Sequence, residues 1–202
     1  MAYDTLPDMG TIEKTAAALK TNNFAVHIVQ DGAEAKEKAL SIIPKKAEVM
    51  TATSVTLDTI GLTEIFNESG EYDSVKSKLA TMDRDTQNRG MQRIGAAPEY
   101  VIGSVHAVTQ DGKVLIASNS GSQLPSYSYG ADHVIWVVGA QKIVQDTDEA
   151  LKRIYERSLP LESERARKAY GVDGSFVSKL LMLNKEREGR ITVILVNEVL
   201  GY

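Results

Sequence analysis

Small polar side chains are concentrated in one short segment of the sequence. Its six residues offer three hydroxyls and two amides and little bulk: Ser118, Asn119, Ser120, Gly121, Ser122 and Gln123. Gly121 can adopt a positive φ, which would let backbone N–H groups converge on an anion. The segment could also be a plain surface loop, but it lies between two apolar segments, which favours a defined turn. Because loops on rigid scaffolds often carry function, we take it as the first candidate binding element.

A second group of hydroxyl residues lies in Thr51-Ala52-Thr53-Ser54-Val55-Thr56, where a predicted strand ends and a helix begins. Free backbone N–H groups and the helix dipole make such a turn a natural anion site. In open α/β sheets, ligands gather at the carboxyl ends of the strands. Ser54 and Thr56 are therefore candidate ligand-binding residues. The alternative is that Ser54 only caps the helix, since serine is an ordinary N-cap residue.

His106 is the candidate catalytic residue, because the ordinary pKa of histidine suits proton transfer near neutral pH. The alternative is a structural role, which is more common for a single histidine on a strand. Neither His27 nor His133 stands at metal-ligand spacing to His106, so we predict no metal site.

Lys142 follows an apolar segment and the pair Gly139-Ala140. It could neutralise the carboxylate or phosphate of a ligand, and we include it among the ligand-binding candidates. Alternatively it is a solvated lysine, which is the default for this residue type. Arg153 lies on a predicted helix after it, and we expect that side chain at the surface.

Composition narrows the classes of protein to which the chain can belong. The 202 residues suit one domain, which we assign to residues 1–202. The share of hydrophobic residues, 43%, suffices for a core without disulfide or metal cross-links. There is no cysteine, which excludes disulfides and thiolate chemistry and fits the cytoplasm. The net charge of −4 shows no basic field for nucleic acid, and the longest apolar runs are far too short to span a membrane. The motifs of dinucleotide-binding folds, P-loop enzymes and α/β-hydrolases are absent.

Strands and helices alternate in the first part of the chain, with strands predicted at residues 24–29 and 47–51. This order favours a parallel sheet with crossover helices. A strand at 100–109 and its return at 114–118 should form a hairpin around Asp111-Gly112. We predict a strand buried on both faces at 133–139, a helix at 146–157 ended by Pro160, and closing strands at 179–184 and 191–196. Residues 67–93 are the most polar stretch, which we interpret as a surface or dimerisation arm.

Several segments, in this order, resemble the lactate-utilisation (LUD) domain family. The resemblance extends from about Leu19 to the end of the chain, and these segments carry it: Ser54-Val55-Thr56-Leu57-Asp58-Thr59-Ile60-Gly61-Leu62, residues 97–109, Ala117-Ser118-Asn119-Ser120-Gly121-Ser122-Gln123, Val137-Val138-Gly139-Ala140-Gln141-Lys142-Ile143-Val144 and residues 195–202.

The resemblance implies a fold like that of the NagB, ribose-5-phosphate isomerase and CoA-transferase superfamily. Such a fold has a Rossmann-like, mostly parallel α/β sheet flanked by helices, with a small antiparallel hairpin appendage. It also implies that Ser54 and Thr56 line one wall of a pocket and Ser118 to Gln123 another. Some family members carry a Glu-Thr-Gly type motif where this chain has His106-Ala107-Val108-Thr109. The missing glutamate nucleophile counts against covalent CoA transfer.

The family resemblance further implies a part in the oxidation of lactate to pyruvate, beside iron–sulfur or flavin oxidoreductase subunits. Without cysteines the chain cannot hold a thiolate-bound cluster, so we expect a cluster-free accessory subunit with no cofactor, binding a small anionic metabolite. One alternative is a stand-alone isomerase or hydrolase acting on a sugar phosphate or CoA-type substrate. Another is a non-catalytic interaction protein that forms a homodimer through residues 67–93.

Overall fold

The two most apolar segments of the chain pair with each other in the middle of a parallel sheet. The computed structural model describes residues 3–202. In it, β7 (His133–Gly139) lies beside β10 (Ile191–Val196), with Trp136 opposite Val193. Alternate residues of β7 enter different cores, Trp136 on one face and Val137 on the other. The prediction of a strand buried on both faces is therefore confirmed.

This main sheet has six strands, and every pair in it is parallel. Across the sheet the strands are, in order, β1 (Ala25–Val29), β10, β7, β4 (Tyr100–Gly103), β2 (Glu48–Thr51) and β3 (Asp73–Ser74). Parallel strands all end at the same edge. The loops after β2, β4 and β7 therefore meet, which is where open α/β sheets bind ligands.

A smaller four-stranded sheet covers part of the main sheet. Its order is β8 (Ile143–Val144), β5 (Ala107–Thr109), β6 (Val114–Ser118) and β9 (Lys179–Leu183). β5 and β6 form the predicted antiparallel hairpin, with Gly112 at φ 83° in its turn. The predicted hairpin appendage is thus present, enlarged by β8 and β9.

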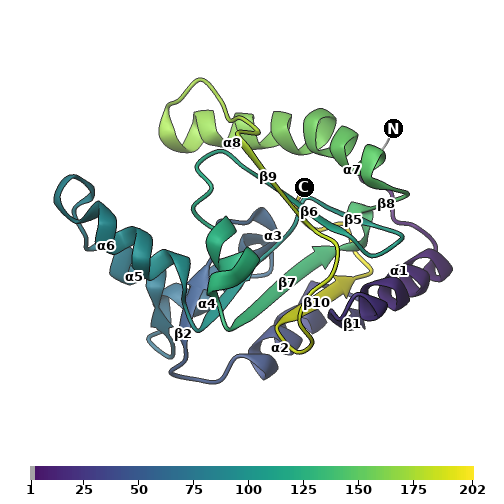
Figure 1. Cartoon of the computed structure of the whole chain (residues 1–202), viewed down its shortest axis with the longest axis horizontal. Helices are drawn as coiled ribbons and strands as arrows, with labels where there is room; N and C mark the ends of the chain where they lie inside the picture. The colour runs from purple at the N-terminus through teal and green to yellow at the C-terminus, as the bar shows by residue number, and fades with distance from the viewer. Residues whose placement is uncertain (1–2) are drawn as a thin grey trace.

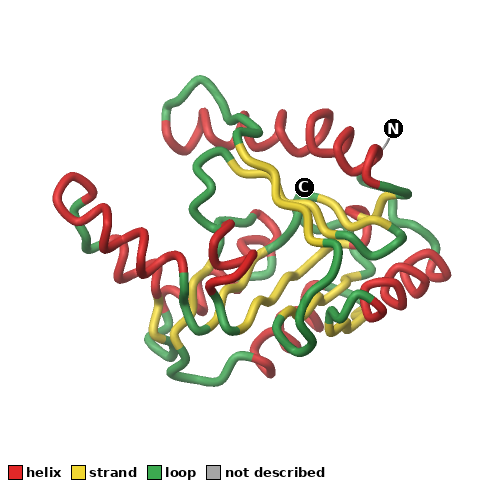
Figure 2. The backbone as a smooth tube through the Cα atoms, in the orientation of Figure 1, coloured by secondary structure: helices red, strands yellow, loops and turns green. Residues whose placement is uncertain are grey.

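Helices cover the outer face of each sheet, α2 and α4 on the main sheet and α7 on the small one (Figures 1 and 2). The helices with their bounds are α1 (Met9–Thr21), α2 (Gly32–Ile42), α3 (Val55–Thr59), α4 (Leu62–Glu68), α5 (Val75–Ala80), α6 (Arg84–Ala96), α7 (Thr147–Arg153) and α8 (Leu159–Tyr170). Apolar residues of α2 and α4 join one core on the main sheet, and Ile12 and Leu19 of α1 join the core between the two sheets. A third core lies between the small sheet and α7. In Figure 1, α5 and α6 project from the body as a separate arm.

Two predicted elements differ in the structure. The segment 100–109 is not one strand, because the chain leaves the main sheet after Gly103 and enters the small sheet at Ala107. The predicted closing strands are both present, as β9 and β10, but they lie in different sheets, since β9 pairs with β6 and β10 with β1 and β7. Pro160 does not end the helix at 146–157. It occupies the first turn of α8, where its missing N–H is not needed, after the π-helical turn Ile154–Ser158.

Arg190, directly before β10, fastens the start of that strand to the body. Its guanidinium donates to the backbone carbonyls of Ser126 (3.0 Å), Tyr127 (2.9 Å) and Ala131 (3.0 Å), and it pairs with Glu186. These carbonyls belong to or directly follow the π-helical turn Ser126–Gly130, which comes shortly after the polar segment 118–123. Arg190 therefore fixes the turn that follows that segment.

Candidate functional site

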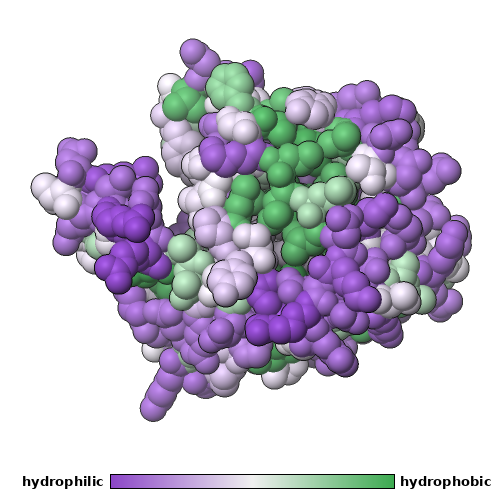
Figure 3. Space-filling model, viewed as in Figure 1, coloured by the Kyte–Doolittle hydropathy of each residue, from purple (hydrophilic) through white to green (hydrophobic). Residues whose placement is uncertain are grey.

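A cavity of about 530 Å³ lies at the edge of the main sheet where the parallel strands end. Its lining comes from the loops after β2 and β4, the polar segment 118–123, α8 with residues 172–177, and the arm. In Figure 3 a recess separates the hydrophilic arm formed by α5 and α6 from the rest of the molecule. Segments far apart in the sequence therefore meet around one space.

Lys142, Ser104 and Thr56 form a cluster at the bottom of this edge, each a short distance past the end of a different main-sheet strand. The Nζ of Lys142 donates to the Oγ of Ser104 at 3.0 Å and to the Oγ1 of Thr56 at 3.1 Å. The hydroxyl of Thr56 donates in turn to the Leu200 carbonyl (3.3 Å). The segments that follow β2 and β4 thus hold one lysine amine through two hydroxyl oxygens.

The amine of Lys142 is buried without a compensating charge. The side chain is only 1% exposed, and no described residue forms an ion pair with it. Burial, and secondly the charge of Arg153, lower the pKa of Lys142 to about 7. The lysine is therefore not the solvated side chain of the alternative interpretation. At neutral pH it is present in both its charged and neutral forms.

His106 lies in the segment that connects the two sheets, not within a strand. Its Nδ1 accepts the N–H of Ala117 (3.1 Å), which leaves Nε2 to carry the proton. Burial, Lys142 and Arg153, in that order, lower its pKa to about 3, although Glu162 opposes them. The imidazole is therefore neutral at pH 7 and can donate a hydrogen bond from Nε2. The prediction that His106 is catalytic remains a prediction. The geometry favours an imidazole that acts as a fixed hydrogen-bond donor through Nε2.

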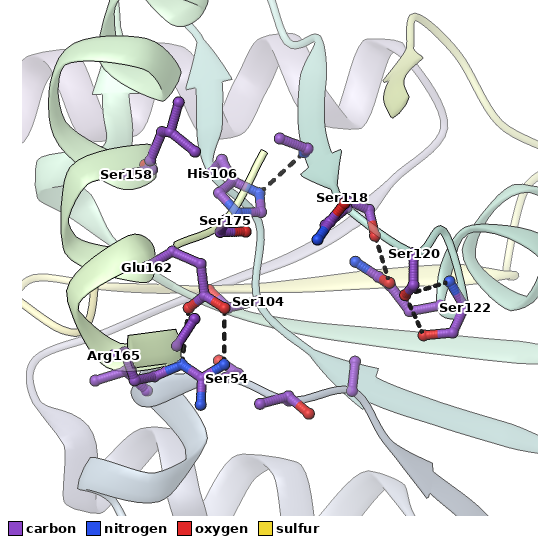
Figure 4. Close-up of a pocket in the computed structure, with 18 of the residues that line it drawn as sticks. Ser54, Ser104, His106, Ser118, Ser120, Ser122, Ser158, Glu162, Arg165 and Ser175 are labelled. Atoms are coloured by element: carbon purple, nitrogen blue, oxygen red, sulfur yellow. Dashed lines mark hydrogen bonds and ion pairs between the residues drawn. The ribbon is translucent and has the colours of Figure 1, made fainter. Parts of the chain in front are cut away.

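Glu162 and Arg165 lie across the cavity from the polar segment 118–123 (Figure 4), and Tyr202 joins them in one polar group. Glu162 receives two hydrogen bonds from Arg165 (2.8 and 2.7 Å) and one from the Tyr202 hydroxyl (2.8 Å). Burial alone would raise the pKa of Glu162, but the hydrogen bonds from Arg165 and Tyr202 outweigh burial and lower it. This carboxylate is therefore ionised and already satisfied at neutral pH.

The polar segment 118–123 lines the cavity, but part of its hydrogen-bonding capacity is used internally. Gly121 has φ 81°, as predicted, and its N–H donates to the Oγ of Ser118 (2.9 Å). The N–H of Ser122 points to the Oγ of Ser120 (3.3 Å), and Ser118 donates to Gln123 (3.0 Å). The backbone N–H groups of Gly121 and Ser122 therefore do not converge on the cavity. The segment presents mainly hydroxyl and amide side chains to it.

The structure brings nearly all predicted site residues together. The cavity lining includes the following predicted residues: Ser54, Thr56, His106, Ser118, Asn119, Ser120, Ser122, Gln123 and Lys142. Gly121 shapes the loop without lining the cavity. Ser54 occupies the N-cap position of α3 but makes no side-chain capping bond there. The hydroxyl of Ser54 therefore remains available to a ligand.

Arg153 corrects one expectation, since its side chain is 0% exposed and not at the surface. The guanidinium donates to the carbonyl of His106 and to Ser158 (3.2 Å). Sequence periodicity missed this because it ranks a charged residue as exposed by default. Ser104, Glu162 and Arg165 were also missed. No sequence signal marks Ser104, because the residues on both sides of it are β-formers and hide the strand end at Gly103, and nothing in the sequence connects α8 to that edge.

Comparison with known proteins supplies the family. The family model for the LUD domain matches residues 12–201. The chain belongs to the LUD domain family. A solved structure of a DUF162 family protein from Deinococcus radiodurans is similar with a TM-score of 0.60 and 14% sequence identity, covering 96% of this chain and 100% of the other. That likeness confirms the α/β fold. Among curated proteins, none matches.

In this LUD protein, residues 200–202 lie beside the cavity, and their close approach to Thr56 depends on Gly201. Gln141 donates to the carbonyls of Leu200 (2.9 Å) and Gly201 (3.1 Å), which places the last residues against Thr56. Gly201 has φ 60°, and a Cβ there would lie 2.3 Å from the Oγ1 of Thr56. In the described part of this LUD protein, no helix is long and apolar enough to cross a membrane.

We expect Gly201→Ala to destabilise the protein by about 1–3 kcal/mol more than Gly189→Ala, measured by urea unfolding. Both glycines have positive φ, but at Gly189 (φ 83°) an added Cβ would meet no atom within 4 Å, so this control isolates the backbone cost. The alanine at 201 must displace Thr56, which also loosens Lys142. Equal destabilisation by the two substitutions would show that the tail does not pack against Thr56.

Proposed function

We propose that this LUD domain protein binds a small organic anion in the cavity at the strand ends. The observation that carries the proposal is the charge of the lining. Among the described residues, Lys76, Arg84 and the partly protonated Lys142 line the cavity without a carboxylate of its lining beside them, whereas Arg165 is paired with Glu162, the one carboxylate side chain of that lining. The chain as a whole has a net charge of −4. A basic cavity in an acidic protein attracts an anion against the field of the surrounding surface.

The cations lie at two depths, which favours a ligand with more than one polar group. Lys142 is buried among hydroxyls, whereas Arg84 is exposed at the start of α6, and Lys76 on α5 bonds to Thr53 (3.1 Å). The volume of about 530 Å³ falls in the range of roughly 300–1,000 Å³ that holds drug-sized ligands. A three-carbon hydroxy acid would leave much of it filled by water. A larger acid or a phosphorylated compound fits better.

The wider role that we propose is the cluster-free accessory component of organic-acid oxidation. Membership of the LUD family supports it, together with the absence of cysteine ligands for an iron–sulfur cluster. The role would require partner subunits that carry the redox centre. Native co-purification with an iron–sulfur or flavin oxidoreductase would support this role, and purification of the protein alone under mild conditions would count against it.

The second candidate function is catalysis on the bound anion, as an isomerase or hydrolase. It is favoured by Lys142, whose pKa of about 7 suits proton transfer or nucleophilic attack at neutral pH. The arm contributes to either function, because Arg84 at the start of α6 lines the cavity. Self-association through residues 67–93 remains a prediction, and analytical ultracentrifugation showing a strict monomer would rule it out.

Isothermal titration with pyruvate, lactate, inorganic phosphate and ribose 5-phosphate tests the proposal. We expect saturable one-site binding of at least one of them, weakened roughly ten-fold or more in Arg165→Met and Lys142→Met. Higher salt should also weaken it, since charge attraction is screened. Lys168→Met is the matched control, because Lys168 is an exposed cation on the same helix as Arg165 and does not line the cavity. Absence of binding for the whole panel, or equal affinities in all variants, would overturn the proposal.

A further inference from the structure

The surroundings of Lys142 match those of an amine that reacts and not only one that binds. Its Nζ reaches the cavity from the segment after β7, yet the described residues that bond to it offer two neutral hydroxyls and no carboxylate. A lysine that served only as a counter-charge for a bound anion could remain partly exposed at the cavity mouth, as Lys76 does. Desolvation beside a second buried cation, Arg153, is an arrangement that activates lysine as a nucleophile.

We propose that Lys142 forms an imine with the carbonyl carbon of a ligand that also carries an acidic group. This deepens the proposed function, on which it rests, by naming the ligand class as a carbonyl compound with a carboxylate or phosphate. The acidic group would meet the cations nearer the mouth, Lys76, Arg84 and Arg165. The carbonyl would then lie at the bottom of the cavity against Ser104 and Lys142.

The hydrogen bonds around Nζ support each part of the reaction. The Thr56 hydroxyl donates to the Leu200 carbonyl, so its oxygen can only accept from the amine, which orients the nitrogen. The Ser104 hydroxyl is 3.0 Å from Nζ and lines the cavity, where it can pass a proton. His106 Nε2–H is a fixed neutral donor in the same cavity, suited to a carbonyl or carboxylate oxygen.

The step balances without an oxidant or reductant. The lone pair of the neutral amine attacks the carbonyl carbon, and the C=O π electrons move to oxygen. One N–H proton passes to that oxygen, by way of the Ser104 hydroxyl, and gives a neutral carbinolamine. The second N–H proton passes to the carbinolamine hydroxyl, which leaves as water as the nitrogen lone pair forms the C=N bond. One amine and one carbonyl are consumed, and one imine and one water are produced. Because burial lowers the pKa of Lys142 to about 7, its neutral fraction at pH 7 is far larger than that of an exposed lysine, which is on the order of one in a thousand.

Trapping with sodium cyanoborohydride at pH 7 tests the inference on the full-length protein. Pyruvate and ribose 5-phosphate are used as separate probes, which distinguishes a 2-oxo acid from a phosphorylated aldehyde. Intact mass measurement and peptide mapping should show a single reduced adduct on Lys142, formed roughly 100-fold faster or more than on exposed Lys168, because far more of the buried amine is neutral. Lys142→Met, which cannot form an imine and which removes the buried charge instead of retaining it, should lose the adduct while remaining folded.

Two further measurements distinguish failure of this inference from failure of the proposed function. Lactate, which has the acid but no carbonyl, should compete with pyruvate without being trapped, and acetone, which has no acid, should label Lys142 much more slowly. If titration shows binding of pyruvate or ribose 5-phosphate but neither is trapped on Lys142, this inference fails and the proposed function stands. If no probe binds and none is trapped, both fail. Adducts spread over exposed lysines, or an unchanged total yield of adduct in Lys142→Met, also overturn the inference.

Discussion

Lys142→Met is expected to stabilise the free protein by a few kcal/mol near pH 6 and by much less near pH 10. In the folded protein burial lowers the pKa of Lys142 to about 7, whereas the unfolded chain has the ordinary value of 10.5. Below pH 7 both states are protonated, and the folded state bears the full cost of a buried charge. Methionine has a similar volume and needs no solvation, so replacing a buried charge by it is often stabilising.

The sign of the pH dependence distinguishes this cause from simple repacking. Between pH 7 and 10.5 the unfolded chain binds the proton that the folded protein has released, so the stability of the unmodified protein rises with pH. That rise should be missing in Lys142→Met. Urea unfolding at several pH values measures it, with Lys45→Met as the control because Lys45 is exposed and paired with Glu71. A variant less stable than the unmodified protein at pH 6 would show that the amine is not buried as a cation.

Arg190→Met is expected to have the largest destabilising effect, about 3–5 kcal/mol. The side chain is only 4% exposed, and its loss leaves three backbone carbonyls and Glu186 without their donor. Buried acceptors left unpaired lose their solvation without compensation. Arg190→Lys should recover little of the loss, because an ammonium cannot reproduce the planar fork of a guanidinium.

Chemical denaturation compares these variants with Arg187→Met, an exposed position in the same turn that should change stability by less than about 0.5 kcal/mol. Because Arg190 holds the turn that follows the polar segment 118–123, its methionine variant should also bind anions more weakly. A destabilisation equal to that of Arg187→Met would mean that the three carbonyls find other donors. The role assigned to Arg190 would then be wrong.

The main sheet could be predicted from the sequence because its central strands are strongly apolar. The strand at 133–139 and the hairpin around Asp111-Gly112 were both identified from local patterns, and both are confirmed. The break between Gly103 and Ala107 could not be predicted, because the residues on both sides of it are β-formers. The two strands differ only in their partners, since β4 pairs within the main sheet and β5 within the small one. Local pattern carries no information about which sheet a strand joins.

The candidate site followed the same division. Loops after parallel strands could be located from the order of elements, and Ser54, Thr56 and Lys142 were identified that way. The α8 residues that line the same cavity could not be identified, because Glu162 and Arg165 resemble an ordinary helical ion pair three residues apart. The burial of Arg153 and Lys142 also could not be predicted from residue type, because charged residues are usually exposed. Three-dimensional packing alone shows that the cavity is basic.

Diffraction from crystals soaked in sodium bromide at about pH 6 tests the central claim, that the cavity is an anion site, most directly. At that pH Lys142 carries its proton, and the anomalous scattering of bromide locates bound anions independently of any assumed ligand. We predict the strongest anomalous peak inside the cavity, beside Lys142 and Ser104, and its loss in Lys142→Met crystals. Bromide bound only at the outer surface, with none in the cavity, would contradict the assignment of this cavity as an anion site.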